Sequence, residues 1–287
     1  MESRYRPYFL LAPILIFLIL VFASGILIAL LQSLGHFPIA GLEGFTLNYF
    51  KAVLTDQSFL DSLGFSLYTS FLSSLISAVL GVMLAFSIYR LDRGRRLAES
   101  LYRIPIIVPH LVSVLLIYNI LSRTGFLPRV LFWLGFIGDP AEFPFLLYSP
   151  SGMGIILAYL WKEIPFVALS TYTVLGRMSQ RLNDAARNLG ASGLQTFRHI
   201  TLPLILPSVF SSFIIIFAFS FGAYEVPLLL GPTTPATLPV KAFIEYSNPM
   251  LMNRPYAMAI NIVIMVIALF LTWLYFMAFA RVNRYEN

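Results

Sequence analysis

Long apolar segments recur along the chain and alternate with shorter polar stretches. A helix needs about 20 mostly apolar residues to cross the hydrocarbon core of a bilayer. Six segments meet that length, near residues 8–31, 65–89, 104–121, 152–176, 203–223 and 256–280. The pattern predicts an all-α membrane protein with six transmembrane helices, folded as a single transmembrane domain over residues 1–287.

The composition agrees with this prediction. Of the 287 residues, 59% are hydrophobic and 11% are charged, whereas a soluble domain carries roughly 25% charged residues. An ordinary soluble enzyme is therefore excluded. With no cysteine and 3 histidines, we expect no disulfide, no thiolate metal site and no histidine-rich metal cluster.

The basic residues set the expected orientation. Thirteen of the 19 lie in the two termini and in the second-to-third and fourth-to-fifth connections: Arg4, Arg6, Arg90, Arg93, Arg95, Arg96, Arg103, Arg177, Arg181, Arg187, Arg198, Arg281 and Arg284. The opposite side has five: Lys51, Arg123, Arg129, Lys241 and Arg254. Cytoplasmic loops are enriched in Lys and Arg, so we expect both termini in the cytoplasm. The basic pI of 9.6 then reflects topology, and we expect no nucleic-acid partner.

The first apolar segment also allows a second interpretation. Arg4 and Arg6 precede an apolar run that contains Ala23, Ser24 and Gly25, as a cleaved signal peptide would. The run continues to Leu31, which is longer than a typical signal core. Its removal would leave five spans, so we expect the segment to be retained.

The connections outside the spans are too short to form a soluble domain. We expect a short apolar helix over residues 127–136 and mostly irregular structure over the proline-rich residues 231–255. No Gly-rich loop ends in Lys-Ser or Lys-Thr, so no phosphate-binding loop is present in the sequence. We therefore expect this chain not to hydrolyse nucleotides by itself.

Residues 177–202 are the most informative connection. Leu182, Ala185, Ala186 and Leu189 repeat at helical spacing, and Gly190 is placed to end that helix in the left-handed conformation. Ser192 and Gln195 have the spacing of a capping box that starts a second helix. Pro203 suits the first turn of the fifth span. The sequence predicts two short helices at an angle, joined closely to that span.

This connection resembles the cytoplasmic motif of permease subunits of binding-protein-dependent ABC importers, which have the type I importer fold. The motif is Glu-Ala-Ala, three residues, Gly, nine residues, Ile, one residue, Leu-Pro. The chain has Asp184-Ala185-Ala186, Gly190, Ile200 and Leu202-Pro203 at the same spacings. The departure is Asp184 for Glu, which keeps the charge and shortens the side chain.

The resemblance implies that the helix pair between spans four and five is a cytoplasmic coupling element. The residues expected to couple to an ATPase are Asp184, Ala185, Ala186, Gly190, Leu194, Phe197, Ile200, Leu202 and Pro203. The implied partners are ATP-binding-cassette ATPase subunits, a second permease subunit that is identical or related, an extracytoplasmic solute-binding protein and membrane lipid. ATP and Mg would bind to the ATPase, with no cofactor in this chain. The implied location is a bacterial or archaeal plasma membrane.

Four residues are candidates for the translocation pathway: Lys162, Glu163, Tyr224 and Glu225. Lys162 and Glu163 lie well inside the fourth span, where charged groups are costly and face a cavity or a partner. They either line the pathway or form structural ion pairs. Because neighbours on a helix point about 100° apart, we expect them to have different partners.

The nature of the solute is open to two resemblances. Residues 221–231 and 45–50 look like polyamine-type and ferric-iron-type permeases, whereas residues 161–166 are similar to sugar-importer permeases. Carboxylates and aromatic rings suit a cation, so we expect a polyamine, another cation or a metal complex, with a sugar-type permease as the alternative. A self-sufficient secondary transporter or channel is the rival class, but it would not need the 177–202 motif. His36, His110 and His199 lack the spacing of an enzyme site.

The predicted topology can be tested with a single cysteine, because the native chain has none. In a Gly193→Cys variant, the thiol should be shielded from a membrane-impermeant reagent in intact cells. The same thiol should react once the membrane is opened. Labelling in intact cells would contradict the cytoplasmic placement of residues 177–201.

Overall fold

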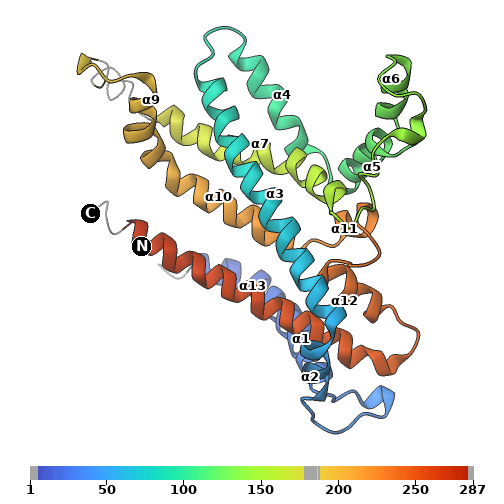
Figure 1. Ribbon diagram of the computed structural model, residues 1–287. Helices are drawn as coiled ribbons and strands as arrows, with labels where there is room; N and C mark the ends of the chain where they lie inside the picture. The colour runs from blue at the N-terminus through green and yellow to red at the C-terminus, as the bar shows by residue number, and fades with distance from the viewer. Residues whose placement is uncertain (1–5, 178–185, 187, 284–287) are drawn as a thin grey trace. The chain divides into compact units, whose positions relative to one another are not determined.

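The computed structural model describes residues 6–177, 186 and 188–283. The regular elements are helical (Figure 1). The helices are α1 (Arg6–Ser33), α2 (Asn48–Thr55), α3 (Gln57–Tyr89), α4 (Arg95–Ile107), α5 (His110–Leu121), α6 (Phe126–Trp133), α7 (Met153–Arg177), α9 (Gly193–Thr196), α10 (Leu202–Gly222), α11 (Glu225–Leu230), α12 (Leu238–Tyr246) and α13 (Arg254–Asn283), and a π-helical turn, η3 (Phe197–Thr201), joins α9 to α10.

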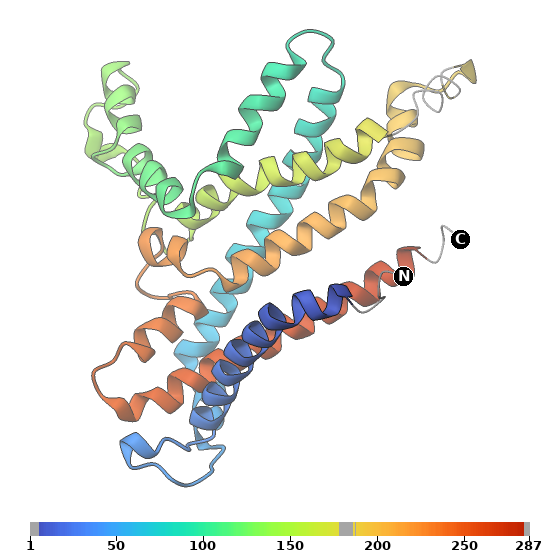
Figure 2. The same ribbon diagram turned by 180° about the vertical axis from the view of Figure 1, so that it is seen from behind.

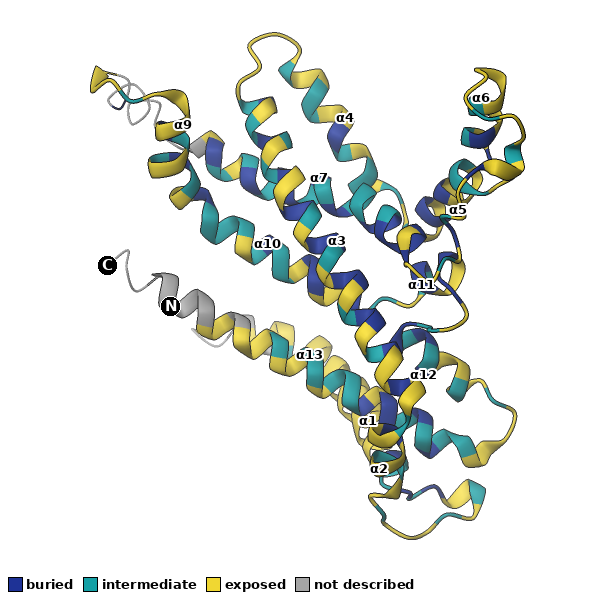
Figure 3. Ribbon diagram, in the orientation of Figure 1, coloured by how far each residue is buried: buried dark blue, intermediate teal, exposed yellow. Residues whose placement is uncertain are grey.

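Six helical segments of the described chain are long and apolar enough to cross a membrane. This confirms the all-α class with six candidate spans. The most apolar window of the first, Leu10–Ser33, has no buried residue. Most large apolar side chains of α1 are exposed as far as Leu30 (Figure 3). A surface so apolar is unstable in water and is covered by lipid or by another apolar surface.

The chain divides into two compact units, and the first comprises Met1–Leu60 and Leu238–Ile267. Asp56 joins the ends of several helices in this unit. It forms an ion pair with Lys241 at 3.2 Å and accepts hydrogen bonds from the Tyr256 hydroxyl at 2.8 Å and from Ser58. Burial alone would raise the pKa of Asp56, but these donors outweigh it and lower the pKa to about 2.

The second unit comprises Asp61–Thr237 and Ala268–Asn287, and α7 is its central helix. In Figures 1 and 2, α4 and α10 both run alongside α7, in agreement with their contacts. One apolar cluster includes Ile155 and Tyr159 of α7 with Val114, and another includes Ala168 and Leu175 of α7 with Ile205. Each cluster packs a different part of α7, so α7 positions the helices around it.

A stripe of small residues brings α3 close to α7. Thr69, Ser73, Ser77, Gly81 and Ala85 follow one another every fourth residue on α3, and none is more than 1% exposed where a side chain is present. A Cβ at Gly81 would lie 2.6 Å from the Cβ of Val167. Small residues allow membrane helices to approach closely, and here they bring hydroxyl groups of α3 beside α7.

The third predicted span, near residues 104–121, is wrong as a single helix. α4 ends at Ile107, Val108 is extended (φ −66°, ψ 129°), and α5 begins at His110. Pro109 explains the break, because it has no N–H to donate and disfavours a helical conformation in the residue before it. The candidate span instead runs from His110 to Trp133.

Two predictions on the connections have different outcomes. A short helix forms near the expected residues 127–136, as α6, but it belongs to the candidate span His110–Trp133 and not to a connection outside the spans. The irregular structure expected over residues 231–255 is partly wrong, because α12 occupies Leu238–Tyr246. Pro239 is the second residue of α12, a position where the missing N–H has no intrahelical partner to lose.

Candidate functional site

A cavity of about 220 Å³ lies within the second unit, among α4, α5, α7, α10 and α11. Its walls are mostly apolar or aromatic, with a few polar side chains. The lining residues are Ile106, His110, Ser113, Val114, Ala158, Tyr159, Lys162, Glu163, Phe166, Ile215, Ile216, Phe219 and Val226. Two of the four predicted pathway residues, Lys162 and Glu163, therefore face the same cavity.

The carboxylate of Glu163 is held by hydroxyl groups from two other helices. Ser77 of α3 donates to one carboxylate oxygen at 3.0 Å, and Ser220 of α10 donates to the other. Glu163 is 4% exposed. A buried carboxylate is tolerated when its oxygens are hydrogen-bonded, so Glu163 fixes α3, α7 and α10 around one end of the cavity.

Lys162 has a different partner, as the 100° spacing predicts. Its Nζ donates to the backbone carbonyl of Val108, at the break between α4 and α5. The last carbonyls of a helix lack intrahelical donors and carry partial negative charge, so an ammonium group is stabilised there. Within the described residues, neither Lys162 nor Glu163 forms the ion pair considered from the sequence.

Aromatic rings form much of the remaining wall. The rings of His110 and Phe219 lie 4.9 Å apart, and Tyr159 donates its hydroxyl to the carbonyl of Ser220 at 3.2 Å. Phe166 lies one turn beyond Lys162 on α7. The faces of such rings attract cations, whereas their edges and the aliphatic residues contact apolar groups.

Tyr224 and Glu225 lie beside the cavity without lining it. Glu225 begins α11 and is half-buried, whereas Tyr224 precedes that helix and is more exposed. The next residue, Val226, contributes to the wall. The structure therefore separates the predicted pathway residues into a pair inside the cavity and a pair next to it.

The described part of the 177–202 connection has the predicted turn and cap, but the prediction of a separate second helix is wrong, because helical residues run without a break from Gly193 to Gly222. Gly190 has φ +82°, the left-handed conformation expected at the end of a helix. Ser192 and Gln195 form both hydrogen bonds of a capping box at the start of α9. Leu194 is 77% exposed, whereas the ring of Phe197 packs at 5.0 Å from the ring of Phe86 of α3.

A groove of about 420 Å³ separates α9 and η3 from the end of α3. Its lining includes Phe86 and Arg90 of α3 and Leu194 of α9, and the guanidinium of Arg90 lies 4.2 Å above the ring of Phe86. The contact between Phe86 and Phe197 makes α3 the neighbour of this segment within the chain.

The other predicted coupling residues lie partly outside the described residues and partly in η3 and the first turn of α10. Asp184 and Ala185 lie outside the described residues, and Ala186 is helical and buried. Ile200 belongs to η3 and is half-buried. Leu202 and Pro203 form the first turn of α10, as the proline pattern predicts.

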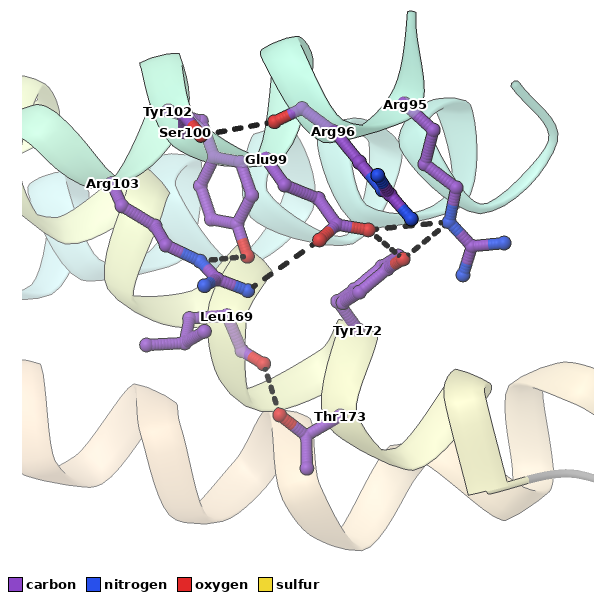
Figure 4. A network of polar contacts seen from close by, with 9 residues as sticks. All are labelled: Arg95, Arg96, Glu99, Ser100, Tyr102, Arg103, Leu169, Tyr172 and Thr173. Carbon is purple, nitrogen blue, oxygen red and sulfur yellow. Dashed lines mark hydrogen bonds and ion pairs between the residues drawn. The ribbon is translucent and has the colours of Figure 1, made fainter. Parts of the chain in front are cut away.

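A polar network connects α4 to the last turns of α7 (Figure 4). Arg95 Nε donates to the Tyr172 hydroxyl at 2.6 Å and to Glu99 at 3.2 Å, and Tyr172 donates to the same Glu99 oxygen. Arg103 lies 3.9 Å from the other Glu99 oxygen. The Tyr172 hydrogen bond, with both arginines, lowers the pKa of Glu99 below its ordinary value.

The two ends of α4 are therefore both tied to α7. Glu99 contacts Tyr172, and Val108 accepts the hydrogen bond of Lys162. Tyr172 lies five residues before Arg177, where the described part of α7 ends. Through these contacts α7 is linked by α4 to Ile106 in the wall of the cavity.

Several of these residues were not predicted from the sequence, because they belong to no recognisable motif. They are Ser77, Ser220, Val108 with its carbonyl, and the pair Glu99 and Tyr172. The repeat Thr69, Ser73, Ser77 was a usable signal, because hydroxyl residues every fourth position form one polar face inside an apolar helix.

The fold and the site define an integral membrane protein of the transporter class, with a small cavity between its helices. A sequence model of the family described as binding-protein-dependent transport system inner membrane component matches residues 77–284. The match covers more than half of the chain, and the chain belongs to this family. It is a permease component of such a transport system rather than an enzyme.

Curated relatives agree with this assignment. The chain is 27% identical over 241 residues to the spermidine/putrescine transport system permease protein PotB of Escherichia coli, covering 84% of this chain and 85% of that one. It is 28% identical over 177 residues to the probable sulfate transport system permease protein cysT of Marchantia polymorpha, covering 61% and 58%.

The fold also has a solved counterpart. A chain in the crystal structure of a bacterial ABC transporter involved in the import of the acidic polysaccharide alginate superposes with a TM-score of 0.78, covering 96% of each chain at 20% identity. At this identity the likeness shows the fold, which is that of an ABC importer permease.

The network of Figure 4 predicts a loss of stability in Tyr172→Phe. The substitution removes the hydroxyl shared by Arg95 and Glu99, and a hydrogen bond to a partly exposed charged group contributes about 1 kcal/mol. Thermal unfolding of the detergent-solubilised protein should occur at a lower temperature. The difference should be full above the ordinary pKa of a glutamate and shrink as acid protonates Glu99 through its lowered pKa.

Tyr68→Phe is the matched control, because Tyr68 is an exposed tyrosine of α3. It should unfold like the wild type at each pH. Equal stability of the two variants would show that the network does not hold α4 on α7.

Proposed function

We propose that this chain forms the translocation pathway of an ATP-driven importer and couples it to a separate ATPase through residues 184–203. The coupling helix pair would dock in a groove on the ATPase, and closure of two ATPase subunits would move it. A second permease subunit would complete the pathway, and an extracytoplasmic binding protein would deliver the solute. Both termini and the docking segment would face the cytoplasm.

The geometry of α9 is the observation that carries this proposal. Its start is fixed by the Ser192–Gln195 capping box, its apolar Leu194 is exposed, and η3 joins it to α10 through helical residues. A push on α9 therefore acts directly on α10, whose Ser220 holds Glu163 at the cavity. Rigid-body movement of packed elements is a common basis of such switches.

For the solute we propose a polyamine-type cation. The relative of spermidine/putrescine systems matches over 84% of the chain. Glu163, the aromatic wall of the cavity and the neighbouring Glu225 supply negative charge and ring faces for ammonium groups.

An oxyanion is the second candidate solute. Lys162 and His110 face the cavity, and a sulfate permease is among the relatives. Uptake of labelled putrescine or sulfate by the reconstituted complex separates the two candidates.

If residues 184–203 couple the permease to the ATPase, two substitutions in this segment should allow normal insertion into the membrane but impair transport. A β-branched side chain at Gly190 is strained at φ +82° by about 1–2 kcal/mol, and Leu194→Ala removes an exposed apolar contact. The loss of an apolar anchor reduces binding by about tenfold or more. Gly190→Val and Leu194→Ala should therefore reach wild-type membrane levels, co-purify with less ATPase and show weak solute-stimulated hydrolysis.

The Phe197→Ala variant should have the same phenotype for another reason, because it removes the contact with Phe86 that supports η3. Leu204→Ala is the control, since Leu204 is a partly exposed leucine of α10 beyond the motif. Wild-type ATPase association and uptake in Gly190→Val and Leu194→Ala would refute the assignment of this segment as the coupling element.

A further inference from the structure

The carboxyl end of α4 lies at the edge of the cavity, where its Val108 carbonyl is bound by the lining residue Lys162. Ile106 of its last turn lines the wall, and the helix stops at Ile107 because Pro109 follows Val108. The terminal carbonyls of a helix attract cations. In membrane transporters, interrupted helices place such ends where they coordinate cations.

A cation of the chain itself occupies this position. The Lys162 ammonium reaches across from α7 and donates to the Val108 carbonyl. Lysine carries its charge on a flexible four-carbon stem with three donors, so the contact can be made and released without moving a helix.

We propose that the carboxyl end of α4 is a binding site for an ammonium group of the solute, and that Lys162 is a tethered occupant that the solute replaces. This inference rests on the proposed function, in which the solute is an amine. The site takes one primary alkylammonium arm. Its volume of about 220 Å³ is below the ~300–1,000 Å³ typical of pockets for drug-sized ligands.

The walls fit such an arm. The ring centroids of His110 and Phe219 lie 4.9 Å apart, and Phe166 is part of the same lining. These rings offer apolar surface to the methylene groups of an alkylammonium chain and ring faces to its ammonium group. The carboxylate of Glu163 is fixed by Ser77 and Ser220 and provides the negative charge that offsets a second cation.

Electrostatic repulsion explains why the solute ammonium group would replace that of Lys162 at the Val108 carbonyl. Two ammonium groups repel each other strongly in a site of low dielectric constant, so both cannot hold the Val108 carbonyl. While Lys162 holds the Val108 carbonyl, the site is closed to small amines that correspond to only part of the solute. Solute binding then releases α4 from one of its two ties to α7, which links occupancy of the cavity to the coupling segment.

The test uses the complete complex, reconstituted in vesicles with its ATPase, its second permease and its binding protein. Uptake of labelled putrescine is measured against increasing n-butylammonium. Lys162→Ala and Lys162→Met both remove the tethered cation from the site. Lys162→Met also keeps the apolar stem of the side chain, and it serves as the test variant if Lys162→Ala impairs assembly. Lys162→Arg retains a tethered cation, and Lys51→Ala removes an exposed lysine elsewhere.

In the Ala and Met variants, n-butylammonium should inhibit putrescine uptake competitively, with an inhibition constant at least tenfold lower than in the wild type. The inhibition constant of the Arg variant should stay close to the wild-type value, because a tethered cation still occupies the Val108 carbonyl. Lys51→Ala should resemble the wild type. Equal inhibition constants in all proteins would overturn the proposal. So would inhibition that putrescine does not relieve.

Failure of the proposed function has a separate signature. If the wild-type complex imports no putrescine, the polyamine assignment fails. Titration calorimetry of n-butylammonium into the detergent-solubilised complexes then decides the site without transport. Heat of binding in Lys162→Met and none in the wild type supports an ammonium site, and the absence of heat in both contradicts it.

Discussion

Two charged residues side by side on a membrane helix impose the constraint on which the rest of the structure depends. Lys162 and Glu163 lie within α7, where an unpaired charge is costly. Their side chains diverge around the helix, so each needs its own partner. The Glu163 carboxylate is satisfied by hydroxyls of α3 and α10, and the Lys162 ammonium by the end of α4. Four helices are thereby fixed around one cavity.

The same helix links the cavity to the segment proposed to meet the ATPase. Tyr172 binds the network of Arg95 and Glu99 near the end of α7, and α10 connects Ser220 at the cavity to η3 and α9. In the proposed mechanism, two routes would connect the coupling segment to the cavity, one through α7 with α4 and one through α10. Packed helices have discrete arrangements, so in this mechanism a small displacement at one end would favour an alternative packing at the other.

The apolar pattern predicted the number of spans because lipid requires long uncharged helices, although it misplaced the third. The loop motif predicted the turn at Gly190 and the cap at Ser192 because both depend on local residues. The sequence shows a proline at position 109, but it does not show what binds at the break between α4 and α5. Only the fold shows that Lys162, 54 residues after Val108, donates to the Val108 carbonyl at this break. Ser77 and Ser220 escaped prediction for the same reason, since their role depends on which helices become neighbours. Phe197 was expected at the docking surface, and its contact with Phe86 likewise depends on tertiary packing.

The central claim is that the Glu163 carboxylate of α7 holds α10 through its hydrogen bond with Ser220. A double-mutant cycle of Glu163→Gln and Ser220→Ala, read out as the free energy of unfolding in detergent, tests it most directly. Residues that share a buried charged hydrogen bond are not additive, and the account predicts an interaction energy of about 1–3 kcal/mol. Additive effects of the two substitutions, within ~0.5 kcal/mol, would contradict it.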